Sequence, residues 1–381
     1  MKIVPTRNAT TLLLACVTAA ATLLSACAPV PQGGDQKSRG ASLVYPAPPD
    51  EPRFVYERTI RGSADVIPDQ EESALRRSLT GEARISEGLG KPYAVATHRG
   101  RLFVSDSVEP FIKVFDVPKG KYSKIGDEEG PGQLRKPLGL DVDDAGTLYV
   151  ADASGKAVVV FDREGKFLRR IGGPKSFERL SSVTVDPAGE RLYVVDIGGI
   201  ASEHHRVRVF DARTGEHLQD IGKRGSGPGE FNLPRDVAIG KNGQLYVVDG
   251  GNFRVQVFDA KGKYLQSFGS IGRQLGNFAR PKEVATDKDG NVYVADAAFG
   301  NFQIFTPDGE LLMYIGERSE TDGPAQYMLP SGIAVDEDGR IYFTDQWFRR
   351  IDVYRPYHLK PEQGYLVHRP EAPAKPAKAA K

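Results

Sequence analysis

The alternation of apolar and polar residues between positions 91 and 355 predicts short β-strands separated by tight turns. The clearest unit covers residues 225–269, in which β-branched and aromatic residues gather in four runs. These runs are residues 236–239, 244–248, 254–258 and 264–268. Glycines at 243 and 262 end two of the intervening turns, where a positive φ is favoured. Four short strands joined by turns predict one antiparallel sheet, which cannot bury both of its faces alone.

The same unit recurs along the chain, and the second run of each copy ends in an aspartate. These residues are Asp106, Asp152, Asp196, Asp249, Asp296 and Asp345. Successive positions are 46, 44, 53, 47 and 49 residues apart. A period of about 45 to 50 residues with four strands per unit is typical of propeller blades. The sequence therefore predicts an all-β, six-bladed β-propeller built from four-stranded antiparallel blades.

Motifs within the fourth unit resemble the NHL repeat. They are GSGPGEFNLP at 225–234, NGQLYVVD at 242–249 and NFRVQVF at 252–258. The resemblance covers residues 91–355. Over this range the sequence is similar to bacterial six-bladed NHL-type propeller lipoproteins. It implies the fold but no single activity, because propellers carry unrelated functions.

The N-terminus predicts an export signal. Lys2 and Arg7 precede an apolar core at 12–24, and LSAC at 24–27 resembles a bacterial lipobox. We therefore expect residues 1–27 to be the signal and Cys27 to carry lipid, with a plain secretory signal as the alternative. Ala28 is not the aspartate that retains many lipoproteins at the inner membrane. The resemblance thus favours the outer membrane, facing the periplasm.

Charge and cysteine content limit the classes of function that the chain can have. The formal charge is +1, and removing Lys2 and Arg7 with the signal leaves −1, so nucleic-acid binding is not expected. Cys16 lies in the signal and Cys27 would be lipidated, so disulfides, Cys-ligated zinc and a Cys nucleophile are excluded. No cofactor is expected. An exported domain of this size can instead rely on apolar burial.

The remaining segments define the domain organisation. We expect residues 28–52 to be a Pro/Gly-rich tether, 53–360 the propeller and 361–381 a largely disordered tail. Within 53–62, Phe54–Ile60 alternates like an outer strand, and the sixth unit lacks one. The segment Phe54–Ile60 should therefore supply the outermost strand of the last blade and close the ring. Residues 364–367 are the rival segment for this closing strand. Residues 69–90 interrupt the pattern, and 71–79 could form a short helix.

No catalytic or metal constellation is recognisable. Repetition of the six aspartates in every unit favours a structural role, in which each accepts backbone amides at its turn, over a carboxylate ring. Acidic turns at 141–146, 287–290 and 336–339 lack the distal glutamate of a calcium loop. His204 and His205 fall in an enlarged loop of the third unit, where a surface position is expected.

Aromatic and basic residues on loops are the candidate binding residues. They are Trp347, Arg349, Phe253 and Arg254 between second and third strands, with Arg235 and Lys282 beside the axis. A packing role is the alternative for residues in repeated slots such as Arg254. The sequence thus predicts a non-catalytic envelope lipoprotein that binds a protein partner, as a monomer or within a hetero-complex. A metal-assisted hydrolase or lyase, or a small-ligand or glycan receptor, stays open.

Overall fold

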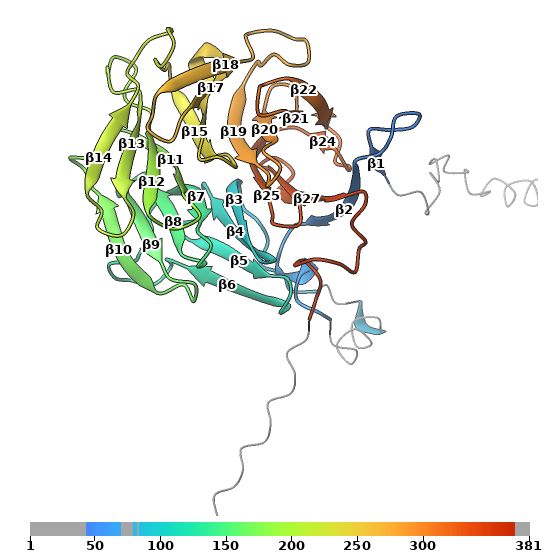
Figure 1. The fold of residues 1–381 in the computed structure, drawn as a ribbon. Coiled ribbons are helices and arrows are strands. Elements are labelled where there is room, and N and C mark those ends of the chain that lie inside the picture. The colour runs from blue at the N-terminus through green and yellow to red at the C-terminus, as the bar shows by residue number, and fades with distance from the viewer. Residues whose placement is uncertain (1–42, 70–78, 82–83, 370–381) are drawn as a thin grey trace, which may run out of the picture. The chain divides into compact units, whose positions relative to one another are not determined.

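Six antiparallel sheets stand around a central axis (Figure 1). The computed structural model describes residues 43–69, 79–81 and 84–369. Five sheets contain four strands and the sixth contains five, so the predicted six-bladed, all-β propeller is confirmed. The described residues also contain two 3-10 turns, η1 (Ser63–Asp65) and η2 (Gly250–Asn252).

Each blade takes its strands in chain order from the axis outward. Blade 1 contains β3 (Pro92–His98), β4 (Arg101–Asp106), β5 (Ile112–Asp116) and β6 (Lys121–Ile125). Blade 2 contains β7 (Pro137–Val142), β8 (Leu148–Asp152), β9 (Ala157–Phe161) and β10 (Phe167–Gly172). Blade 3 contains β11 (Leu180–Val185), β12 (Arg191–Asp196), β13 (Arg206–Asp211) and β14 (His217–Ile221).

The second half of the ring follows the same plan until its last blade. Blade 4 contains β15 (Pro234–Ile239), β16 (Leu245–Asp249), β17 (Arg254–Phe258) and β18 (Tyr264–Phe268). Blade 5 contains β19 (Pro281–Thr286), β20 (Val292–Asp296), β21 (Asn301–Phe305) and β22 (Leu311–Ile315). Blade 6 contains β25 (Pro330–Val335), β26 (Ile341–Asp345), β27 (Arg350–Pro356), β2 (Phe54–Ile60) and β1 (Val44–Tyr45). A short parallel pair, β23 (Glu317–Arg318) and β24 (Gln326–Tyr327), precedes blade 6.

Burial follows from blades that stack face to face. All residues of β8 and β9 are buried, whereas the outer strand β10 alternates between exposed positions and positions that are half-buried or, at Ile171, buried. The middle strands lie between two neighbouring blades, and this explains their continuous apolar runs. One apolar cluster fills each of the six interfaces between neighbouring blades. The cluster between blades 6 and 1 joins Tyr342 and Ile351 to Val104, so the core continues around the whole ring.

The N-terminal strand β2 completes the last blade. It pairs antiparallel with β27, from Phe54 opposite Pro356 to Ile60 opposite Ile351 (Figure 1). Residues 364–367, the rival segment, form turns and no strand. The ring is therefore closed by hydrogen bonds between the two ends of the propeller rather than by chain continuity.

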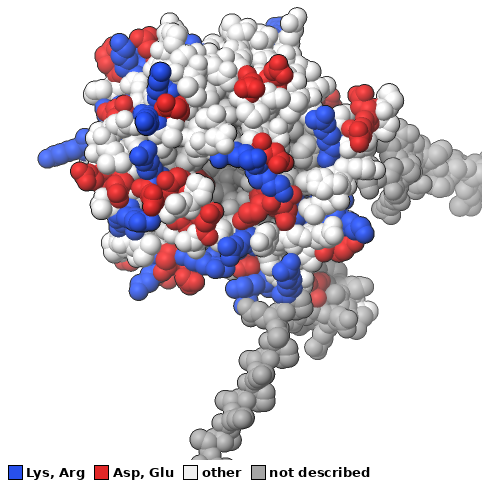
Figure 2. Space-filling model, in the orientation of Figure 1, with Lys and Arg blue, Asp and Glu red and all other residues white. Residues whose placement is uncertain are grey.

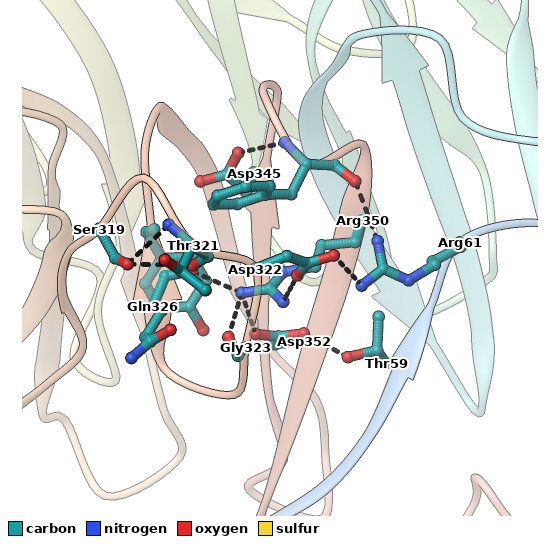
Figure 3. A network of polar contacts seen from close by, with 12 residues as sticks. Thr59, Arg61, Ser319, Thr321, Asp322, Gly323, Gln326, Asp345, Arg350 and Asp352 are labelled. Carbon is teal, nitrogen blue, oxygen red and sulfur yellow. Dashed lines mark hydrogen bonds and ion pairs between the residues drawn. The ribbon is translucent and has the colours of Figure 1, made fainter. Parts of the chain in front are cut away.

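A polar network reinforces this junction (Figure 3). Arg61, just beyond β2, donates to Asp322 at 2.7 Å and to the Phe348 carbonyl at 3.1 Å. The Thr59 hydroxyl donates to Asp352 at 2.6 Å. Asp322 also pairs with Arg350, so this carboxylate joins the closing strand to the blade that it completes.

Arg350 is the buried centre of the network. Its guanidinium is paired with Asp322 and with fully buried Asp352 at 3.2 Å, and it also donates to the carbonyls of Gly323 and Gln326. A buried carboxylate is costly unless it is paired, so Asp352 depends on Arg350.

Some expected segments lie outside the described residues. They are the signal with Cys27, most of the tether, residues 71–78 of the expected helix and the tail from residue 370. Among the described residues, no helix has the length and apolarity needed to cross a membrane.

Replacing Arg350 tests the junction. Arg350→Met should lower the free energy of unfolding by about 3–5 kcal/mol, because Asp352 loses its buried counter-charge. The neighbouring Arg349 is exposed and serves as the matched control, so Arg349→Met should change stability by about 0.5 kcal/mol or less. Urea unfolding followed by circular dichroism measures both. Equal effects of the two substitutions would contradict a supporting role for the network.

Candidate functional site

The six repeated aspartates gather the loops on one face of the propeller. Each is fully buried and accepts amides from the loop that precedes its own blade. Asp106 accepts from Gly90 and Lys91, and Asp196 accepts from Arg179. This confirms the predicted structural role, since the carboxylates bind backbone amides in every blade. We call the surface formed by these inter-blade loops and the turns between second and third strands the loop face.

Blade 6 shows how both kinds of loop meet. Asp345 accepts from Leu329 in the loop before the blade at 3.1 Å and from Trp347 in the turn after β26 at 2.7 Å. The same turn is held from the side by Arg61, which binds the Phe348 carbonyl. Trp347 is 62% exposed on this fixed turn. Arg349, also exposed, adopts a φ of 53°. Both are therefore presented to solvent on the loop face.

Phe253 and Arg254 belong mainly to the scaffold. The Arg254 guanidinium donates to Asp249 at 2.9 Å and to the carbonyl of Gly227 at 2.8 Å. Phe253 is half-buried and packs against the core between blades 4 and 5. These contacts favour the packing alternative for the repeated arginine slot, because Arg254 joins its aspartate to the preceding loop.

Arg235 and Lys282 lie at the axis with three further basic residues. Lys91, Arg179 and Arg280 immediately precede the inner strands β3, β11 and β19, while Arg235 and Lys282 are the second residues of β15 and β19. The positive charges of Arg280, Arg235 and Lys91 act on Lys282, and that of Arg179 acts on Arg235. We call these five residues the collar. Figure 2 shows basic and acidic side chains around the centre of the face in view.

Two carboxylates are buried directly below the collar. Asp236 follows Arg235 and accepts from the Ser182 hydroxyl at 2.5 Å and the Val284 amide at 2.8 Å. Glu283 follows Lys282 and accepts from the Ile333 amide at 3.2 Å. Each side chain therefore binds the inner strand of the next blade. These bonds tie blades 3 to 6 together at the hub.

Burial perturbs the titration of this pair. It raises the pKa of Asp236 to about 6, against the hydrogen bonds from Ser182 and Val284. Burial also raises the pKa of Glu283 well above its usual range, and the charge of Asp236 adds to the increase. Tyr93 is close to both carboxylates, and its pKa is raised chiefly by burial. The hub thus holds two carboxyl groups whose pKa values are raised by burial, a property common at functional sites.

A cavity of about 400 Å³ occupies the hub. Its lining includes Asp236, Glu283 and His98, and it runs to the turns between first and second strands, away from the loop face. None of the collar residues lines it. Within the described ranges, no three His, Cys, Asp or Glu residues group as ligands for a metal ion. The acidic turns serve the fold, since Asp143 accepts from the amides of Ala145 and Thr147.

The histidine loop of blade 3 is only partly at the surface. His204 is exposed and its Nδ1 lies 2.5 Å from Glu178. His205, expected at the surface, is instead 1% exposed. Its Nδ1 accepts from the Leu233 amide at 3.1 Å, and its Nε2 contacts the Gly199 carbonyl at 3.1 Å. The surface prediction is wrong for His205 because the enlarged loop folds back over the junction with blade 4.

The proximity of Asp236 and Glu283 in the hub was not predicted from the sequence, in which no catalytic constellation was recognised. A signal was available. Both residues occupy the third position of an inner strand, after Pro234 and Pro281, in consecutive units. Identical repeat positions in neighbouring blades lie side by side in a propeller.

Comparisons with known proteins agree with the fold. The profile of a family described as "6-bladed beta-propeller" matches residues 199–269. A Caenorhabditis elegans protein named as a probable peptidyl-alpha-hydroxyglycine alpha-amidating lyase is 33% identical over 113 residues, which is 29% of this chain and 30% of that protein. Human NHL repeat-containing protein 3 is 31% identical over 153 residues, covering 33% of this chain and 42% of that protein. The chain thus matches less than half the length of either relative.

A solved structure extends the likeness to most of the propeller. A gluconolactonase from Xanthomonas campestris superposes with a TM-score of 0.55 at 16% identity, covering 79% of this chain and 98% of that one. This likeness concerns the fold alone. The chain is a six-bladed β-propeller, and its similarity to NHL-repeat proteins supports NHL-type repeats. The names of the relatives include an enzyme and a protein named only for its repeats, so they favour no single activity.

The pKa of Asp236 gives a testable pH dependence. A folded-state pKa of about 6, above the ordinary 3.8, means that the folded protein holds the proton more tightly. The resulting stability is present below about pH 4 and is lost as the pH rises through about 6. Asp236→Asn should therefore gain stability relative to the natural protein between about pH 4 and 7, as measured by urea unfolding. The exposed Asp144→Asn is the control. Parallel pH profiles for the natural protein and Asp236→Asn would contradict the assignment.

Proposed function

We propose that this chain is a non-catalytic β-propeller scaffold that binds a protein partner on its loop face. The observation that carries the proposal is the exposed Trp347 on a turn fixed by Asp345 and Arg61. Tryptophan and arginine contribute most often to the energetic centres of protein interfaces, and a preformed turn lowers the entropy cost of binding. Arg349 beside Trp347 supplies the arginine.

Rigidity of the surrounding blade supports this proposal. The turn that bears Trp347 lies beside the network of Arg61, Asp322 and Arg350 (Figure 3). Because this network joins the closing strand to blade 6, the surface around Trp347 is built from both ends of the propeller. A partner docked there would contact a surface that exists only in the closed ring.

The proposed location is the bacterial cell envelope. The pattern at residues 1–27 favours export and lipidation of Cys27, and the part of the expected tether that precedes β1 would join the lipid to the propeller. An outer-membrane position facing the periplasm is the version that we propose, with the scaffold working as a monomer or within a hetero-complex. The propeller needs neither disulfides nor a cofactor for this role.

A second candidate is a hydrolase or lyase reaction in the hub. The cavity of about 400 Å³ with buried Asp236 and Glu283 favours it, because acids with raised pKa values can transfer protons near neutral pH. The partial similarity to a protein named as a lyase is consistent with this candidate. Metal analysis of the purified protein and turnover assays with lactones test this candidate. Turnover that Asp236→Asn abolishes would support it.

The loop-face proposal predicts a loss of partner binding. Trp347→Ala/Arg349→Ala should remove the specific partner from an affinity pull-down out of detergent-solubilised membranes, because the exposed anchor is gone. Tyr314→Ala/Arg163→Ala removes an exposed aromatic and an exposed arginine elsewhere and is the matched control. Mass spectrometry of the captured proteins gives the readout. An unchanged list of captured proteins for Trp347→Ala/Arg349→Ala would refute the loop-face proposal.

The anchoring proposal is tested separately. Cys27→Ala should abolish incorporation of radioactive palmitate and shift the exported protein from the membrane to the soluble fraction, because no thiol remains for the diacyl group. Cys16→Ala leaves the lipobox intact and is the control. Continued labelling of Cys27→Ala would exclude Cys27 as the lipidated residue.

A further inference from the structure

The collar is an unusual concentration of like charge. Lys91, Arg179, Arg235, Arg280 and Lys282 come from blades 1, 3, 4 and 5, and the inner strands of those blades surround the axis. Within the described part of the chain, none of the five side chains forms an ion pair or a hydrogen bond. Like charges that crowd without partners destabilise a folded protein, so a compensating anion is the simplest reason for such an arrangement.

The backbone fixes the collar in place. The amides of Lys91, Arg179 and Arg280 donate to Asp106, Asp196 and Asp296, respectively. The Arg235 carbonyl accepts from the Ser181 hydroxyl at 3.0 Å. Four of the five side chains therefore start from anchored backbone positions, which reduces the entropy lost when they close on a ligand.

Electrostatic crowding is visible at Lys282. Its pKa is lowered to about 8, mainly by burial and also by the charges of Arg280, Arg235 and Lys91, while the charge of Glu283 acts in the opposite direction. Burial is also the main cause that lowers the pKa of Arg235. An anion placed among these groups would further favour the charged form of Lys282.

The position of the collar indicates the size of the anion. Lys91, Arg179, Arg235 and Arg280 are exposed, and the hub cavity excludes all five collar residues. A small molecule enclosed by the hub would not contact them. The collar instead lies on the loop face. Arg280 shares Asp296 with Ala298 in the turn after the second strand, and Lys91 shares Asp106 with Val108 in the same way.

We propose that the collar binds an acidic segment of a protein partner, whose carboxylates lie over the axis on the loop face. Arginine pairs with carboxylates through two parallel hydrogen bonds, and Arg179, Arg235 and Arg280 offer three such groups. This inference rests on the proposed function, because it names the chemistry of the partner that the loop face receives.

The test uses the purified propeller and poly-L-glutamate as the probe. Arg235→Gln/Lys282→Gln should weaken binding at low salt by about tenfold or more, because two charge-assisted contacts are lost. Arg163→Gln/Lys263→Gln removes one arginine and one lysine from exposed turns between third and fourth strands and should have little effect. Isothermal titration calorimetry measures all three proteins. Equal affinities of the natural protein and Arg235→Gln/Lys282→Gln would overturn the proposal, as would equal losses in the two double variants.

The pH dependence of the affinity distinguishes a direct contact by Lys282 from a purely structural role of this residue. Affinity for poly-L-glutamate should fall as the pH rises through about 8, since Lys282 then loses its proton and its positive charge. Lys282→Arg should keep the affinity and remove this pH dependence. An unaltered pH profile in Lys282→Arg would count against a direct contact.

Two further binding measurements, with lipid vesicles and with inorganic phosphate, distinguish the possible sources of the negative charge. If Arg235→Gln/Lys282→Gln lowers binding to phosphatidylglycerol vesicles but leaves poly-L-glutamate binding unchanged, the collar faces lipid and the proposal is wrong. The same holds if only inorganic phosphate binding falls. The pull-down with Trp347→Ala/Arg349→Ala tests the loop face independently. A partner lost there, together with no collar-dependent poly-L-glutamate binding, would overturn this inference and leave the proposed function standing.

Discussion

A buried aspartate at the end of each second strand is the interaction on which the rest of the propeller depends. Asp296, for example, accepts amides from Ala279 and Arg280 in the preceding loop and from Ala298 and Phe299 in its own turn. A buried carboxylate is stable only when its oxygens are satisfied, and several backbone donors at one carboxylate achieve this. Each aspartate thereby joins the turn after the second strand of its blade to the loop that leads into the same blade. The loop face exists because this joint is repeated around the ring.

The hub adds a second kind of joint that differs between blades. Ser182 binds Asp236, Asp236 binds the amide of Val284, and Glu283 binds the amide of Ile333. On the opposite side of the ring, Ser331 donates to the carbonyl of Tyr93 at 2.7 Å. The bonds at the hub therefore differ from one pair of blades to the next. Functional sites require such asymmetry. Both buried acids and three of the five collar residues belong to blades 4 and 5.

Much of the fold could be predicted from the sequence because the repeat is local. The spacing of the aspartates identified six blades, and the alternation within Phe54–Ile60 indicated an outer strand for the blade that lacked one. The site was harder to predict. Lys91 and Lys282 are far apart in the chain and influence each other only after the ring has closed. His205 illustrates the same limit, because its burial depends on how an enlarged loop folds over the next blade. Local patterns identify strands and turns, whereas the neighbours of a residue across the axis come from the tertiary arrangement.

Ring closure by β2 also has a consequence for synthesis. The ribosome makes β2 before any blade, yet its partner β27 is the last strand of the propeller. A nascent chain therefore carries an unpaired outer strand at one end and a growing open edge at the other until Pro356 has been translated. Such edges can pair with foreign strands, and contacts between distant segments form slowly. The continuous core of the closed ring can therefore form only after β27 has been synthesised.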